Sequence, residues 1–212
     1  MTTIETRFKG ILRYAITLFA ALWIVLCLTL FTVGVALADE NTLLDNRNYE
    51  SGGMASSNFG YGNLAGEAVP VSGFHANWII NHSLRLGFYS ESNSLEDEYD
   101  MTIDGIKYGI NIETTGLDIG YTCDSDRILH PVCGLMIGGG YLKSKRLEDG
   151  HTERSDFFIV QPRIGVELNV TKWMRVETLA TWRLANGVES DLFDDRDIGG
   201  WSAFIGFSFG WF

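Results

Sequence analysis

The sequence predicts an all-β fold, an eight-stranded antiparallel transmembrane β-barrel preceded by a signal peptide. Two observations predict this fold. The last stretch, residues 198–212, alternates between large apolar and small side chains, and a similar alternation recurs in seven earlier segments. The connections between the segments alternate between short turns and long charged loops, as in barrels whose first and last strands start and end on the inner side of the membrane.

The closing stretch carries the strongest signal. Its odd-numbered side chains are all apolar and are aromatic at both ends: Trp201, Ala203, Ile205, Phe207, Phe209 and Trp211. Because successive side chains of a strand point to opposite faces, these residues share one face. In a transmembrane barrel that face meets lipid, and the two tryptophans lie at the two membrane interfaces.

The chain begins with the three parts of a secretory signal peptide. Basic residues precede a long apolar run, which ends in Ala36-Leu37-Ala38 directly before acidic residues. The run is also long enough to remain as a membrane anchor. With cleavage after Ala38, the expected regions are a signal peptide over 1–38, a periplasmic lead-in over 39–50 and the barrel over 51–212.

The expected strands are 52–64, 69–79, 83–92, 107–122, 132–144, 156–169, 174–185 and 198–212. In the fourth, the apolar parity changes from even numbers before residue 113 to odd numbers after residue 116. A bulge over 113–116 reconciles the two halves, since one extra residue exchanges the faces of a strand. Pro162 in the sixth strand removes one ladder hydrogen bond.

The face opposite the apolar rows carries four basic and four acidic side chains: Arg85, Glu91, Asp118, Arg163, Glu167, Arg175, Glu177 and Arg183. In an eight-stranded barrel this face fills a narrow interior. Buried charges have to be paired and hydrogen-bonded, so a balanced set suits a closed interior. The same arginines facing lipid would cost roughly 2–4 kcal/mol each. The alternative is a soluble sheet whose charged face meets water.

The overall charge excludes one large class of function. The 212 residues carry a net charge of -11, and without residues 1–38 there remain 13 basic and 26 acidic residues, a net charge of -13. Binding to nucleic acid needs a basic surface to contact phosphates, so a nucleic-acid-binding protein is not expected.

Two segments, GFHANWIINHSL at 73–84 and VELNVTKW at 166–173, resemble a recurrent, uncharacterised group of small bacterial outer-membrane β-barrel proteins. The resemblance covers 51–212. It implies the outer membrane of a Gram-negative-type bacterium, contact with the bilayer and with lipopolysaccharide, and assembly by the barrel-insertion machinery. Such barrels end on an aromatic residue that continues the apolar row. Here the row belongs to Trp211, so either Trp211 takes the terminal role or the register slips by one at Phe212.

The expected role is structural or concerns interactions at the cell surface. No enzymatic activity, cofactor or metal is expected, because the sequence lacks a nucleophile elbow, a phosphate loop and a zinc-ligand cluster. One alternative is a lipocalin-like periplasmic binding module with the two faces reversed. Another is a lipid A-modifying enzyme that uses His82 and Ser83. His75, on the interior face, is expected to be a hydrogen-bonded structural residue.

Three smaller features complete the expectations. Cys123 and Cys133 flank a turn in an exported protein, which predicts a disulfide between them. Acidic loops around 96–100 and 191–197 offer oxygen ligands for Ca²⁺ but lack the spacing of an EF-hand, and a solvated loop is the simpler interpretation. Lys143, Lys145 and Arg146 are candidates for contact with the phosphates of lipopolysaccharide.

Overall fold

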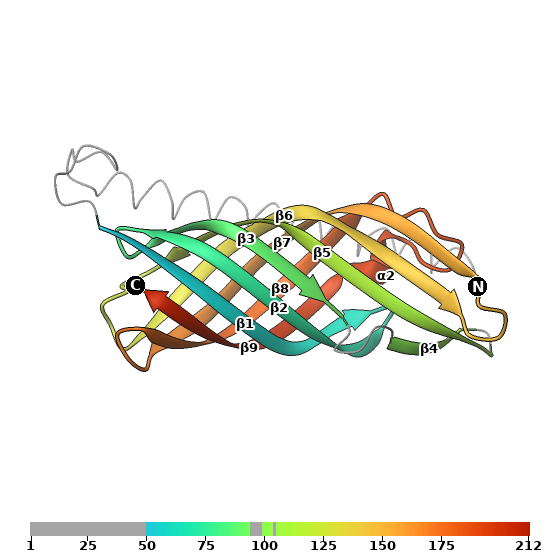
Figure 1. Cartoon of the computed structure of the whole chain (residues 1–212), viewed down its shortest axis with the longest axis horizontal. Helices are drawn as coiled ribbons and strands as arrows, with labels where there is room; N and C mark the ends of the chain where they lie inside the picture. The colour runs from blue at the N-terminus through green and yellow to red at the C-terminus, as the bar shows by residue number, and fades with distance from the viewer. Residues whose placement is uncertain (1–49, 94–98, 104) are drawn as a thin grey trace, which may run out of the picture. The chain divides into compact units, whose positions relative to one another are not determined.

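The computed structural model describes residues 50–212, apart from 94–98 and 104, so the predicted signal peptide and lead-in up to residue 49 lie outside the described residues. The described chain forms an all-β, closed, eight-stranded antiparallel barrel, as predicted (Figure 1). The strands are β1 Ser51–Leu64, β2 Glu67–Ile80, β3 Leu84–Ser92, β4 Tyr99–Ile103, β5 Ile106–Thr122, β6 Leu129–Arg146, β7 Thr152–Asn169, β8 Met174–Asn186 and β9 Gly200–Trp211.

Closure of the barrel depends on two pairings between strands distant in the chain or separated by an insertion. β1 pairs with the last strand, β9, from Gly53–Trp211 to Gly62–Ser202, and β3 pairs with β5 across the inserted β4. β4 pairs with β5 as an additional short strand at its outer end. The eight remaining strands therefore form a wall with no open side in the membrane-spanning part, as a membrane barrel requires.

The predicted bulge in the fourth expected strand is wrong. β5 pairs with β6 in one unbroken register from Tyr108–Arg146 to Thr122–Val132. The even-numbered Ile110 and Ile112 point into the barrel and are almost fully buried, although they are apolar. The apolar pattern changes parity because the filling of the interior changes along the strand, and the strand itself is regular.

The interior has two layers, which overlap along the barrel: Leu179 of the apolar layer lies nearer the inner turns than Arg183 of the charged one. The apolar layer lies mostly nearer the outer loops and contains Leu64, Val69, Val71, Met101, Tyr108, Ile110, Ile112, Leu142, Phe157, Ile159, Leu179 and Phe204. Phe193 and Ile198 from the loop between β8 and β9 pack onto this cluster. The short helix α2, Asp195–Ile198, holds Ile198 in place, and Asp194 caps it by accepting hydrogen bonds from the next turn. The barrel is thus closed at its outer end by side chains.

The exterior is the apolar surface expected for contact with lipid. The odd-numbered residues of β9 are exposed, and its even-numbered ones are buried, as predicted. Trp182 and Trp201 lie directly opposite each other at one end of the apolar belt, and Trp78 and Trp211 lie at the other. This arrangement contradicts the lipocalin-like alternative, in which the apolar rows point inward. Among the described residues, no helix is long and apolar enough to cross a membrane.

The barrel wall is taller on one side. β5, β6 and β7 have 17 or 18 residues, whereas β3 has 9 and a membrane crossing takes about 9–11. Residues 106–112, 140–146 and 152–157 of these strands rise beyond the ends of β3 and β8, and we call them the upper wall (Figure 1). Its inner face bears the apolar cluster, so the tall strands belong to the same packed unit as Phe193 and Ile198.

Pro162 lies within the wall of the barrel. It pairs with Leu135 of β6 on one side, while the ladder to β8 resumes only at Val160–Leu184 and Arg163–Thr181 on either side of it. The register is the same on both sides of this gap. A proline is therefore accommodated in a central strand at the cost of a local interruption of the ladder to one neighbour.

Candidate functional site

The charged side chains of the interior lie mostly nearer the inner turns, while Glu91 and Arg183 lie near the outer ends of β3 and β8. All eight residues predicted for the interior are at most 6% exposed: Arg85, Glu91, Asp118, Arg163, Glu167, Arg175, Glu177 and Arg183. We call them the lumen charge network. They come from β3, β5, β7 and β8, and each is placed inside by the parity of its strand.

Glu167 is the most heavily contacted acid of the network. One of its oxygens, Oε2, lies 2.5 Å from Arg85 Nη2, 3.2 Å from Arg175 Nη1 and 3.0 Å from His130 Nε2. Three strands in addition to its own are therefore tied to one carboxylate. Since all four side chains are buried, water cannot replace any of these contacts cheaply.

Asp118 is a second centre. Arg163 Nη2 lies 2.8 Å from Asp118 Oδ1, His75 Nδ1 lies 3.0 Å from Oδ2, and Asn77 donates to Oδ2 at 3.1 Å. The interior position of His75 is the one expected from its parity, and its ring is hydrogen-bonded. The cluster joins β2, β5 and β7 across the barrel.

The other members have polar rather than ionic partners at close range. Gln161 donates to Glu91 at 3.0 Å, and Arg183 donates to Ser202 Oγ at 3.3 Å. Glu177 lies directly opposite Glu167 in the ladder, and the Asn58 amide is placed to donate to it at 3.0 Å. The structure therefore places the eight residues together but does not arrange them as four simple pairs.

Sequence reasoning missed one member of the interior, His130, which is fully buried. The expected strand began at residue 132, so His130 was assigned to a turn. The signal was present, because His130 has the same parity as Val132 and Met136, which also point inward. Asn58, Asn77 and Gln161 have the same inward parity and complete the hydrogen bonds of the charged groups.

Space for Arg163 comes from a glycine of β5, which is separated from β7 by β6. A Cβ atom at Gly120 would lie 2.7 Å from Arg163 Nη2, the nitrogen that contacts Asp118. Gly120→Ala is therefore expected to displace the guanidinium and to lower the free energy of unfolding by roughly 1–3 kcal/mol. Urea unfolding in detergent measures this change. Gly139→Ala, where the nearest atom would be 3.6 Å away, is the control and should be close to neutral.

The C-terminal residues divide between the two faces of the wall. Trp211 is 81% exposed on the outer face, while the Phe212 ring lies 3.9 Å from the guanidinium carbon of Arg175 at the inner mouth of the barrel. The register of β9 with β1 is regular up to Trp211, so Trp211 takes the terminal outward position and no register slip occurs. Phe212 instead covers the charge network from the inner side.

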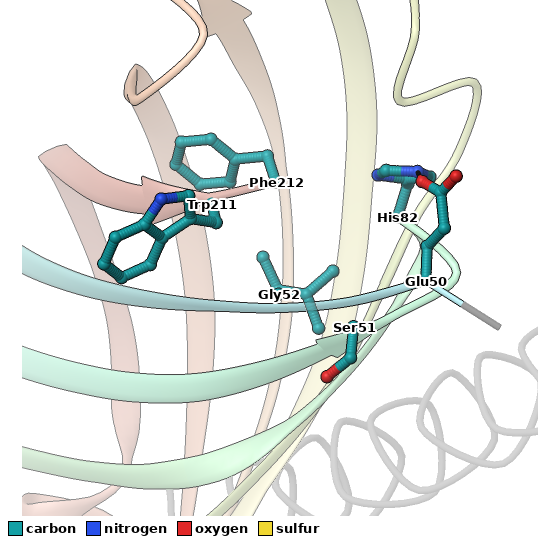
Figure 2. Close-up of a pocket in the computed structure, with 7 residues that line it drawn as sticks. Glu50, Ser51, Gly52, His82, Trp211 and Phe212 are labelled. Atoms are coloured by element: carbon teal, nitrogen blue, oxygen red, sulfur yellow. Dashed lines mark hydrogen bonds and ion pairs between the residues drawn. The ribbon is translucent and has the colours of Figure 1, made fainter.

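A pocket of about 260 Å³ opens beside these residues, between the start of β1 and the turn after β2 (Figure 2). Glu50 Oε2 and His82 Nε2 form a hydrogen bond at its rim. Ser51 is turned away from this pair and accepts a hydrogen bond from Trp78 Nε1 at 2.6 Å (Figure 2). Ser51 is thus not aligned with the pair as a nucleophile would be.

The predicted disulfide between Cys123 and Cys133 is not present, and the two residues are not bonded to each other. The hairpin register explains this. Cys133 lies opposite Tyr121, and Cys123 donates its backbone N–H to Pro131, so the two thiols are displaced by two residues along the ladder. Side chains in such diagonal positions are about 7–8 Å apart, beyond the reach of a disulfide.

The corrected assignment predicts two reactive thiols per denatured, unreduced chain that lacks residues 1–38. Partial burial, followed by the nearby Asp124, raises the pKa of the Cys123 thiol, so its labelling in the folded barrel should be slow at neutral pH. Counting thiols with and without denaturant tests both statements. A count of zero in the denatured, unreduced chain would restore the disulfide.

The outer face of the upper wall is basic. Lys143 and Lys145 of β6 point outward, because Leu142 and Ser144 between and beside them are buried. Arg154 lies directly opposite Lys143 on β7. Arg146, which the sequence suggested as a third member, contacts Asp149 at 3.1 Å instead. The backbone N–H of His151, aided by Arg146, holds the pKa of Asp149 below its usual range, and this pair shapes the turn.

The acidic outer loop between β8 and β9 uses its carboxylates for its own fold. Asp195 accepts a hydrogen bond from the Val188 backbone at 2.8 Å, and Asp194 and Asp197 form the reciprocal cap of α2. Within the part of the chain that the structure describes, no group of three or more His, Cys, Asp or Glu side chains is placed to hold a metal ion.

Comparisons with solved structures agree with this fold. The Neisserial surface protein A shares 12% identity with this chain, with a TM-score of 0.56 over 77% of this chain and 99% of that one. The attachment invasion locus protein of Yersinia pestis shares 10% identity (TM-score 0.48, 76% and 97% covered), and a major outer membrane protein of Thermus thermophilus also shares 10% (0.45, 76% and 99%).

No family model and no curated protein matches the sequence. At these identities the likeness concerns the fold alone. The chain has the fold of the bacterial outer-membrane eight-stranded β-barrels.

Proposed function

We propose that the protein is a non-conducting barrel of the outer membrane that acts through its outer surface and contributes to the structure of that membrane. One observation carries the proposal: inward-facing side chains along the described barrel are buried, whereas its outer face is exposed. The charge network and the apolar cluster, which includes Phe193 and Ile198, together line the interior with buried side chains. A path for solutes would have to disrupt both layers.

The proposal includes a location and partners. The apolar belt between two sets of aromatic residues suits a bilayer, and the secretory leader predicted from the sequence suits export. Contact with lipopolysaccharide and assembly by the barrel-insertion machinery belong to the same proposal. No catalytic role is part of the proposal; Ser51, beside the Glu50–His82 pair, donates no hydrogen bond to it and instead accepts one from Trp78.

Fractionation of cells followed by planar-bilayer recording tests the proposal. We expect the protein in the outer-membrane fraction, with gel migration that changes on heating, and no steady conductance after reconstitution. A variant that opens both layers, Phe193→Ala with Glu167→Ala, is the positive control for detecting conductance. Recovery in the soluble periplasmic fraction, or a stable open channel in the natural protein, would refute the proposal.

A further inference from the structure

The basic residues outside the barrel are not spread evenly. Of the twelve lysines and arginines between Glu50 and Phe212, four lie in the interior and four lie on the outer face of the upper wall. These four are Lys107, Lys143, Lys145 and Arg154. Three of the four lysines after residue 38 belong to this group, in a region whose net charge is strongly negative. Such clustering on one face suggests a negatively charged partner for that face.

The cluster is compact. Lys143 and Arg154 are directly opposite in the ladder of β6 and β7, which places their Cβ atoms roughly 4.5–5.5 Å apart. The guanidinium carbon of Arg154 lies 4.3 Å from the centre of the Tyr141 ring, and its Nη2 contacts Asp156 at 3.1 Å. Lys143 and Arg154 therefore present two basic side chains at adjacent positions of one face.

The height of the cluster identifies the anion. On the outer face of β6 the side chains pass from Leu135 and Ile137 through Tyr141 to Lys143 and Lys145. Tyr141 has the place of an interfacial aromatic residue. Lys143 is two residues further, which corresponds to about 5 Å along the membrane normal for a strand tilted by roughly 40°. This is the level of lipid headgroups, just outside the apolar layer.

We propose that Lys143, Lys145 and Arg154 form a binding site for a phosphate group of a phosphorylated outer-leaflet glycolipid. Arg154 supplies a planar fork that matches phosphate oxygens, and the lysines supply point charges around it. Tyr141 holds Arg154 in place through its ring. The site rests on the proposed function, because it requires the outer face of the upper wall to border the outer leaflet.

A charge-matched pair of variants tests the site. The triple variant Lys143→Gln, Lys145→Gln, Arg154→Gln removes it. The triple variant Arg127→Gln, Lys172→Gln, Arg196→Gln makes the same change in net charge elsewhere. Each protein is reconstituted in phosphatidylcholine bilayers with a minor fraction of bis-phosphorylated lipid A, and the retained lipid A is measured by native mass spectrometry. Each basic residue at an anionic membrane surface contributes roughly fivefold in affinity, so we expect at least a tenfold loss in the first variant alone.

Three results would overturn the proposal: equal retention by the natural protein and the first variant, equal loss in both variants, or equal retention of lipid A without phosphates. Displacement by inorganic phosphate alone would overturn the lipid assignment and leave a small-anion site. If the first triple variant does not fold, Lys145→Gln alone should show a smaller loss of retention. Fractionation distinguishes a failure of the phosphate site from a failure of the proposed function. The first triple variant should lose lipid A but still reach the outer membrane.

Discussion

Replacing Glu167 by Gln is expected to lower the free energy of unfolding of the barrel by about 3–5 kcal/mol. The carboxylate is fully buried and contacts Arg85, Arg175 and His130 through one oxygen. The amide keeps the shape of the side chain but leaves Arg85 and Arg175 without their shared negative charge. Urea unfolding in lipid or detergent, followed by heat-modifiable gel migration, measures the change.

Glu148→Gln is the matched control, because Glu148 is exposed in the turn after β6 and should respond by less than about 0.5 kcal/mol. A double-mutant cycle between Glu167 and Arg85 should give a coupling energy well above that of an exposed pair such as Arg154 and Asp156. Equal effects of Glu167→Gln and Glu148→Gln would show that the interior network does not stabilise the barrel.

Replacing Ile205 by Arg is expected to impair membrane insertion. Ile205 is 55% exposed on the outer face of β9, midway between Trp201 and Phe209. A charged side chain on the lipid face near the middle of the bilayer costs roughly 2–4 kcal/mol. The fraction of chains that become protease-resistant in liposomes gives a direct measure.

Thr102→Arg adds the same charge to an exposed position of β4, outside the closed wall, and should insert normally. Gly206→Arg, on the inner face of the same strand as Ile205, should fail for a different reason, because a Cβ atom there already meets Asn58 and Glu177 at 2.1–2.8 Å. Normal insertion of Ile205→Arg would contradict a lipid-facing position for this row.

The sequence predicted the outer face of the wall well because lipid imposes one uniform requirement on it. Residues such as Phe88, Val166 and Trp182 are apolar wherever they face the bilayer, so alternation alone assigns them. The inner face has no such uniform requirement. Ile110 and Ile112 are apolar and inward, and for this reason parity suggested a bulge that β5 does not contain.

The remaining differences concern information that spacing does not contain. In the pairing of β6 with β5, Cys133 lies opposite Tyr121. The alternation of side chains along each strand does not reveal this register. β4 lies in a segment whose acidic composition indicates a solvated loop, yet Met101 is buried as part of the apolar cluster. Interior partners such as His130 become recognisable only when the true start of β6 is known.

The upper wall has a consequence for the thermodynamics of recognition. A mobile surface loop that orders on binding gives up about 1–2 kcal/mol of backbone entropy per residue. The strands 106–112, 140–146 and 152–157 already have their ladder hydrogen bonds, and their inner face is packed. A ligand that meets their outer face finds it pre-organised, so even a few weak ionic contacts there yield net affinity. Lengthening three strands, rather than three loops, therefore places the cost of ordering in folding and removes it from binding.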